Sequence, residues 1–217
     1  MSMKTSLTAG LAGLLFLVGP LQGEDPGWIE LFDGKTLDGW SKTGGDAVFK
    51  AEGGAITGSG AKKTTFLVTK EDYGDFELVF EYKLHDLDLN SGVQFRSERT
   101  PSRERVNTLK GPQIELTKSP GRSGLIFRQG GGAWITPEDK LVRNSAAKNG
   151  EWNTVKLRVE GPRIQTWING ILINDSVSEE DQKRYASGAI GLQVHGIRDY
   201  DGTPRRASWR GIRLKKL

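Results

Sequence analysis

Alternation of apolar and polar side chains is the feature that most limits how this chain can fold. Residues 76–84 place large apolar side chains at each even-numbered position, and residues 154–159 place them at each odd-numbered one. Successive side chains of a β-strand point to opposite faces of a sheet, so each segment is predicted to be a strand with one buried face. The predicted core includes Phe76, Phe80, Val155, Leu157 and Leu192.

Turn and cap signals complete this pattern. Asn169–Gly170 separates two apolar runs and favours a tight hairpin, because both turn positions need a positive φ. Ser178, followed three residues later by Asp181, is typical of a helix N-cap, and the short helix that it begins is predicted to end at Gly188. Such strands suit a sandwich or a barrel. We predict an all-β fold, a two-sheet antiparallel β-sandwich with one short helix.

The first 23 residues have the character of a secretory signal. Lys4 is the only charged residue before Glu24, residues 7–18 are almost wholly apolar or small, and Pro20 and Gly23 follow. A membrane-spanning helix needs roughly 20 apolar residues, and this run is shorter. Residues 1–23 are therefore predicted to be a signal peptide and residues 24–217 a single domain. The protein is expected to be exported, periplasmic or extracellular, without stable membrane insertion.

Charge and cysteine content exclude several classes of function. The formal net charge of the whole chain is +4, and the basic residues are scattered among acidic ones. Nucleic-acid-binding proteins concentrate positive charge on one face, so a nucleic-acid partner is not expected. The chain has no cysteine, which excludes disulfides, thiolate metal sites, cysteine nucleophiles and lipid attachment at a cysteine.

Three strand-like segments carry two polar residues at positions i and i+2, and hence on one face. These pairs are Gln94 with Arg96, Gln113 with Glu115, and Gln193 with His195. If the three strands share a sheet, amide, guanidinium, carboxylate and imidazole groups converge on one face, a set that suits a polyhydroxylated ligand such as a sugar. An ordinary solvent-facing sheet surface is the alternative. His195 could act as a base, a hydrogen-bond donor, a metal ligand or a structural residue.

Metal-binding signals are weak. Asp86, Asp88 and Asn90 alternate as at the start of a calcium loop, but Gly92 comes one place late and the glutamate of such a loop is missing. The sequence also lacks the His-Glu-x-x-His motif of a zinc helix. A polar turn that enters a strand is the favoured interpretation. A divalent metal ion remains an option to which no ligand set is assigned.

Several motifs resemble those of one bacterial family. They are residues 28–40 (WIELFDGKTLDGW), 90–96 (NSGVQFR), 150–153 (GEWN), 169–170 (NG), 188–196 (GAIGLQVHG) and 209–214 (WRGIRL). In this order they resemble the 3-keto-disaccharide hydrolase family, from Gly27 to the end of the chain. Two positions depart from the family pattern: Glu115 stands where an aspartate is usual, and Phe127 where a tyrosine is usual.

The resemblance implies a concanavalin A-like jelly roll and activity on glycosides oxidised at the 3-position. The ketone acidifies the proton on the neighbouring carbon, so a base can remove it, the glycosidic oxygen leaves by β-elimination, and water adds to the resulting glycal. Glu115 or His195 would be the base, and Arg96 would stabilise the enolate, alone or beside a metal. The substrate-binding residues would be Asn90, Gln94, Gln113 and Gln193. A non-catalytic carbohydrate-binding module of the same fold and a β-sandwich interaction domain are the alternatives.

Overall fold

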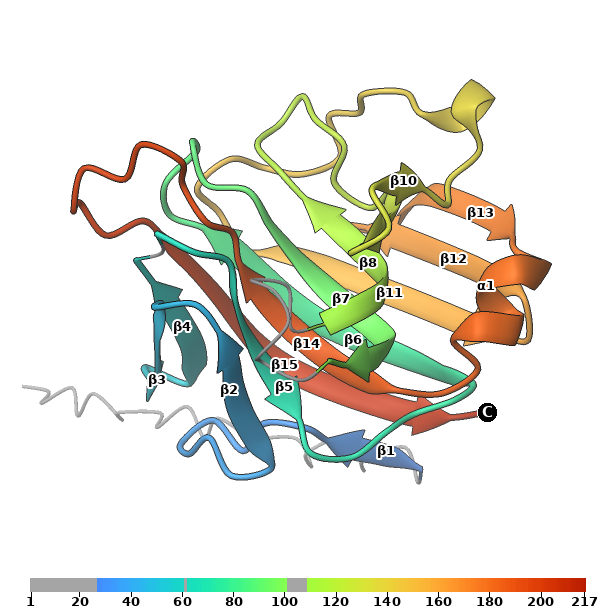
Figure 1. Cartoon of the computed structure of the whole chain (residues 1–217), viewed down its shortest axis with the longest axis horizontal. Coiled ribbons are helices and arrows are strands. Elements are labelled where there is room, and N and C mark those ends of the chain that lie inside the picture. The colour runs from blue at the N-terminus through green and yellow to red at the C-terminus, as the bar shows by residue number, and fades with distance from the viewer. Residues whose placement is uncertain (1–26, 61, 101–108) are drawn as a thin grey trace, which may run out of the picture.

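Two antiparallel sheets pack face to face in the computed structural model, which describes residues 27–60, 62–100 and 109–217 (Figure 1). Sheet A has the strand order β13-β12-β11-β6-β15-β4-β3, with β1 paired to β15. Sheet B has the order β10-β9-β8-β7-β14-β5-β2. The predicted two-sheet sandwich is thus confirmed. The predicted signal peptide lies outside the described residues.

The strands of both sheets are short to medium in length. Those of sheet A are β1 (Trp28–Glu30), β3 (Val48–Glu52), β4 (Ala55–Ser59), β6 (Phe76–Leu84), β11 (Asn153–Glu160), β12 (Arg163–Ile168), β13 (Ile171–Val177) and β15 (Arg206–Lys216). Those of sheet B are β2 (Trp40–Gly44), β5 (Thr65–Thr69), β7 (Ser91–Arg99), β8 (Leu109–Leu116), β9 (Ile126–Gln129), β10 (Ala133–Trp134) and β14 (Ala189–Val194). A 3₁₀ turn (Glu138–Lys140) and the helix α1 (Glu179–Arg184) complete the described elements.

The core lies between the two sheets, where the alternation of the sequence placed it. Along β6 every second side chain is buried, and its partner β11 repeats the pattern in register, with Val155 opposite Phe80 and Leu157 opposite Leu78. All five residues of the predicted core are at most 1% exposed. Burying these side chains supplies most of the driving force for folding in a chain that has no disulfide.

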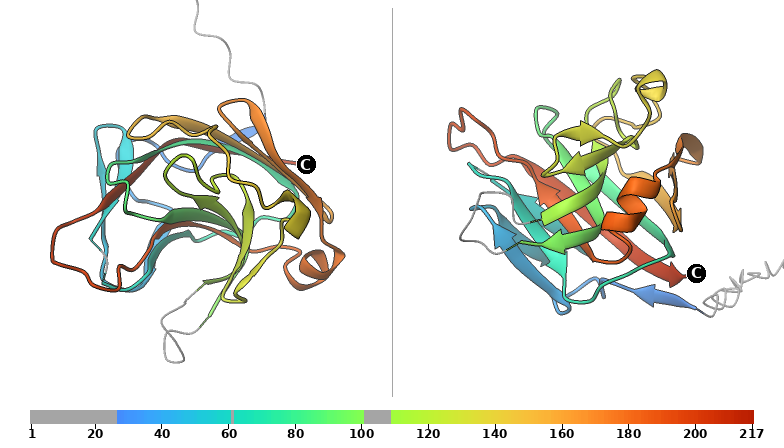
Figure 2. Two further views of the ribbon diagram at one scale, coloured as in Figure 1. Left: turned by 90° about the horizontal axis from the view of Figure 1, so that it is seen from above. Right: turned by 45° about the vertical axis from the view of Figure 1, so that its right-hand side comes forward.

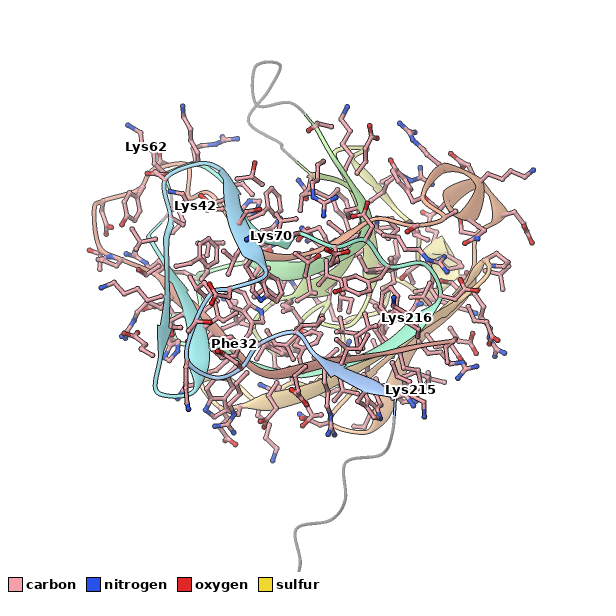
Figure 3. All side chains as sticks on the ribbon, turned by 90° about the horizontal axis from the view of Figure 1, so that it is seen from below. Phe32, Lys42, Lys62, Lys70, Lys215 and Lys216 are labelled. Atoms are coloured by element: carbon pink, nitrogen blue, oxygen red, sulfur yellow. The ribbon has the colours of Figure 1, made fainter. Side chains whose placement is uncertain are left out.

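The ends of sheet A close the core from below. Phe32 follows β1 and packs into the core on the lower side of the molecule (Figure 3). Lys215 and Lys216 lie at the far end of β15, where Lys215 is the register partner of Trp28 in β1 (Figure 3). The N-terminal strand is therefore held against the C-terminal one.

The hairpin of β12 and β13 turns at Asn169 and Gly170, whose φ values are 51° and 80°. Both residues are in the left-handed region that a tight turn of this kind requires, as predicted. The N-cap of α1 is also as predicted, because the Ser178 hydroxyl accepts a hydrogen bond from the Asp181 backbone N–H.

The end of α1 differs from the prediction. The helix stops at Arg184, with Tyr185 as its C-cap, four residues before Gly188. Gly188 instead pairs with Tyr73 through two backbone hydrogen bonds. A Cβ at this position would lie 2.6 Å from the backbone of Arg96, so the glycine permits a close approach to β7 rather than a helix end.

Helix α1 lies at one end of the sandwich, beside β12 and β13 (Figures 1 and 2). It is attached to sheet B by Arg128 of β9, whose guanidinium donates to both carboxylate oxygens of Asp181 at 2.8 and 2.9 Å. Within the part of the chain that the structure describes, no helix has the length and apolar character needed to cross a membrane.

Candidate functional site

The outer face of sheet B, which is turned away from the core, carries Gln94, Gln113, Glu115 and Gln193. The register places Gln193, Gly92 and Glu115 directly opposite one another on β14, β7 and β8, and Gln94 opposite Gln113 in the next row. A Cβ at Gly92 would lie 2.5 Å from the Gln113 side chain. The glycine therefore makes room for the long amide side chains that cross it.

A buried network of amides fills this face. Gln113 is at its centre: its Oε1 accepts from Nε2 of Gln94 and, at 3.0 Å, from Nε2 of Gln193, while its own Nε2 donates to Glu115 Oε2 at 2.8 Å. Gln193 is also 3.4 Å from Gln129 Oε1. The three predicted glutamines are 0%, 2% and 1% exposed. The three glutamines lie together; Gln113 bonds to Glu115 directly, and Gln94 and Gln193 hold Gln113.

Glu115 lies where this network meets the surface. Asn90 Nδ2 donates to Oε1 at 2.7 Å, so each carboxylate oxygen has an amide donor. Burial nevertheless raises the pKa of Glu115 above its ordinary value, and the two hydrogen bonds and the positive charge of Arg122 only partly oppose this effect. A carboxyl with a raised pKa is a stronger base when ionised than an ordinary carboxylate, which suits it to accept a proton.

A pocket of about 470 Å³ opens above Glu115. The connections β6–β7, β8–β9 and β10–β11 form its walls, and the latter two gather at the top of Figure 1. Its lining consists of Leu87, Asp88, Leu89, Asn90, Glu115, Thr117, Lys118, Pro120, Gly121, Arg122, Trp134 and Arg143. Of the seven predicted site residues, Glu115 and Asn90 are the two that line it.

An aromatic wall stands on one side of this pocket. Trp134 of β10 is half-buried and packs edge-on against Phe127, with ring centroids 5.2 Å apart. The guanidinium carbon of Arg122 lies 5.0 Å from the centroid of the Trp134 ring. A tryptophan face beside a carboxyl, an amide and a cation suits a ring that is apolar on its faces and polar at its edges.

His195 lies outside the pocket lining. It directly follows Val194, the last residue of β14 and the register partner of Ser91, and so lies just beyond the end of the ladder. Its side chain reaches solvent, but nearby protein atoms partly desolvate the imidazole, and this lowers its pKa. The imidazole is therefore neutral at neutral pH.

Arg96 is placed differently from the prediction. A bulge shifts the β7 register between Gln94 and Glu98, and Arg96 has a φ of 46°, so the i, i+2 alternation fails at this residue. Its guanidinium is buried, pairs with Asp75 and donates to the carbonyl oxygens of Gly74 and Gly161, both at 2.8 Å. The expectation that Arg96 joins the other polar residues was wrong, because it ties β7 to the ends of sheet A.

The two aspartates of the turn before β7, Asp86 and Asp88, are bonded to arginine residues. Asp86 Oδ2 accepts from the backbone N–H of Arg206 at 2.8 Å, and Asp88 pairs with Arg205 at 2.9 Å. Among residues 27–60, 62–100 and 109–217, no group of three or more His, Cys, Asp or Glu side chains is arranged to hold a metal ion. The polar-turn interpretation of this segment fits these contacts, and the donor set does not fit a protein-held cation.

Sequence reasoning missed the cations and the tryptophan of the pocket, namely Lys118, Arg122, Trp134 and Arg143. All but Trp134 lie in loops, where no periodicity indicates which way a side chain points. Trp134 lies in a two-residue strand after three glycines, and an aromatic residue in such a glycine-rich segment was the one available signal.

The comparison with protein families decides the identity of the fold family. The 3-keto-alpha-glucoside-1,2-lyase-like domain matches residues 27–215. The chain belongs to this family. The resemblance inferred from the motifs is confirmed, and family membership places the chain among carbohydrate-related proteins. No curated protein matches the chain.

Similar solved structures show the same fold at low sequence identity. A proposed glycosyl hydrolase from Parabacteroides distasonis is 22% identical over 88% of this chain and 94% of its own, with a TM-score of 0.61. The carbohydrate-binding module CBM66 from Bacillus subtilis is 15% identical over 82% and 96%, with a TM-score of 0.58. A protein of unknown function with a galectin-like fold from Bacillus subtilis is 14% identical over 82% and 89%, with the same TM-score of 0.58. The jelly-roll fold of this lyase-like domain is thereby confirmed.

Proposed function

We propose that this lyase-like domain cleaves 3-keto-glycosides by β-elimination in the pocket above Glu115. The observation that carries the proposal is the position of Glu115, a carboxyl with a raised pKa held by two amides at the floor of a pocket with a tryptophan wall. A proton-transfer group needs a fixed position and a pKa shifted toward the working pH; two amides fix Glu115, and burial shifts its pKa upward.

The proposed reaction balances without a redox partner. Glu115 removes the proton from C2, next to the ketone at C3, and the electrons of the C–H bond enter the enolate. The enolate then expels the oxygen at C1, which leaves with a proton as the free alcohol and gives a 2-hydroxy-3-keto-glycal. Water adds across the C1–C2 double bond, with hydroxide at C1 and a proton at C2, to give the free 3-keto-sugar.

Arg122 takes the role that the sequence had suggested for Arg96. Its positive charge already acts on Glu115, and its contact with the Trp134 ring holds the guanidinium on the pocket wall. A fixed cation at this place stabilises the negative charge that develops on the ketone oxygen. Asn90 holds Glu115 and lines the pocket beside it. His195, whose pKa is lowered, is the alternative base.

A non-catalytic carbohydrate-binding module is the second candidate function. The observation that favours it is the packing of the three glutamines, which bond to one another as a rigid support and leave one carboxyl at the pocket. A rigid polar floor beside an aromatic wall is also what a binding site requires. In this case the protein would bind the sugar without turning it over.

Deuterium incorporation separates these two functions from each other and from ordinary hydrolysis. The protein is incubated with a 3-keto-α-glucoside in D₂O, and the released sugar is analysed by NMR. Elimination followed by hydration predicts one deuterium at C2, above the exchange measured without protein. Release of sugar that retains hydrogen at C2 would contradict the elimination route, and binding without release would favour the module.

A further inference from the structure

The pocket above Glu115 carries more positive charge than the proposed reaction uses. Three cations line it: Lys118, Arg122 and Arg143. The reaction develops one negative charge at a time, on the enolate oxygen, and Arg122 is the cation whose charge acts on Glu115. Lys118 and Arg143 therefore have no task in that step.

The acidic residues of the pocket do not neutralise these two cations. Asp88 pairs with Arg205, which also contacts Asp201 at 3.1 Å. Glu115 accepts hydrogen bonds from two amides and lies at the floor. No ion pair or side-chain hydrogen bond joins Lys118 or Arg143 to another residue of the described chain.

Two arginines on strands of sheet A have carboxylate partners. Arg163 forms two hydrogen bonds to Asp175, at 2.9 and 2.7 Å. Arg210 pairs with Glu81 at 2.7 Å. Arg143 lines the pocket without such a partner among the described residues, and its side chain is exposed to an incoming ligand.

From this arrangement we infer that the pocket accepts a sugar bearing an oxyanion, a carboxylate or a sulfate or phosphate ester, held between Lys118 and Arg143. Guanidinium and ammonium groups bind such oxyanions by charge-assisted hydrogen bonds, and an arginine can do so with two bonds at once. The inference concerns the substrate class of the same pocket, and so it rests on the proposed function for its location.

Binding of matched ligands to the full mature protein tests this inference. The probes are methyl α-glucoside, its 6-sulfate, its 6-phosphate and methyl α-glucuronide, measured by titration calorimetry. We expect at least one anionic probe to bind about tenfold or more tightly than the neutral one, and the preference to weaken as salt is raised. The three anionic probes together show which oxyanion the pocket favours.

Charge variants connect the preference to these residues. Lys118→Gln and Arg143→Gln should each remove most of the preference for the anionic probe, and Arg143→Lys should retain much of it. Arg184→Gln is the matched control, because Arg184 is exposed, lies 5.3 Å from the Tyr185 ring and is outside the pocket. This variant should bind all probes as the wild type does, and melting temperatures check that each variant is folded.

Two results would overturn the inference: equal affinity for neutral and anionic probes, including no measurable binding of any, or a preference that survives both glutamine variants. The inference is tested by the affinity for each probe, whereas the proposed function is tested by cleavage of a 3-keto-glycoside. A preference for the anionic probe without any cleavage would uphold the inference and contradict the elimination reaction. Cleavage of a neutral 3-keto-glucoside without any preference would do the reverse.

Discussion

At the scale of single residues, local backbone geometry decided which polar side chains meet. Gln94, Gln113 and Gln193 follow the alternation of their strands and form one network. Arg96 follows the same rule in the sequence but lies in a bulge, so its side chain leaves the row. A bulge depends on how neighbouring strands pair, and a single strand's sequence does not indicate it.

The sequence pattern also did not indicate that the three glutamines are buried. Polar residues on the outer face of a sheet are expected to face solvent, yet these glutamines are at most 2% exposed. Gln113 accepts from Gln94 and Gln193 and donates to Glu115, which offsets part of the cost of burying these amides, but within the described chain Oε1 of Gln94 and Oε1 of Gln193 have no hydrogen-bond partner. Glu115 consequently has a rigid support, and its proton affinity is set mainly by burial.

The pH dependence of turnover identifies the base. Burial raises the pKa of Glu115 above 4.5, whereas desolvation lowers the pKa of His195 below 6.5. A base acts when deprotonated, so activity should fall as the pH falls through the pKa of the residue responsible. We expect kcat/KM to show an acid limb with a midpoint above 4.5 that His195→Ala leaves in place. Loss of this limb in His195→Ala would assign the base to His195 instead.

At the scale of elements, the strands of the core were predictable because their pattern is long and regular. Residues 76–84 are β6 in the structure, and the hairpin at Asn169–Gly170 has the expected turn. The end of α1 was not predictable from Gly188, because that glycine meets the backbone of β7, far away in the sequence. Long-range contacts, which local propensity does not contain, determined the difference.

The packing of β11 predicts the effect of shortening a core side chain. Leu157 is 0% exposed and lies opposite Leu78. Leu157→Ala should lower the free energy of unfolding by about 2–5 kcal/mol, through lost burial and the cavity left behind. Denaturant unfolding measures the change. Leu172→Ala is the control, because Leu172 is 50% exposed, and a comparable loss there would contradict the assignment of the core.

At the scale of the whole molecule, the two sheets and the family were predictable, but the pocket was not. Its walls come from the connections β6–β7, β8–β9 and β10–β11, which are separate in the sequence and meet only in the folded structure. The predicted site contributed its floor, Glu115 and Asn90. The residues that give the pocket its charge and its aromatic wall were found from the structure.

The N-terminal segment of the chain predicts that the protein is exported. Lys4, the apolar run and Gly23 predict removal of residues 1–23 by a signal peptidase. Mass spectrometry of the protein recovered from its native organism should show a chain that begins near Glu24. Recovery of a chain that still begins at Met1 would contradict the prediction.

The most direct test of the account is the rate at which Glu115→Gln releases 4-nitrophenol from 4-nitrophenyl 3-keto-α-glucoside. Asn90 Oδ1 is buried and has no hydrogen-bond partner, so the Asn90 amide can turn to accept from the amide that this substitution introduces and preserve the fold. We predict a rate about 100- to 10,000-fold below that of the wild type, at an almost unchanged melting temperature. Turnover by Glu115→Gln at the wild-type rate would contradict the assignment of Glu115 as the proton-transfer group.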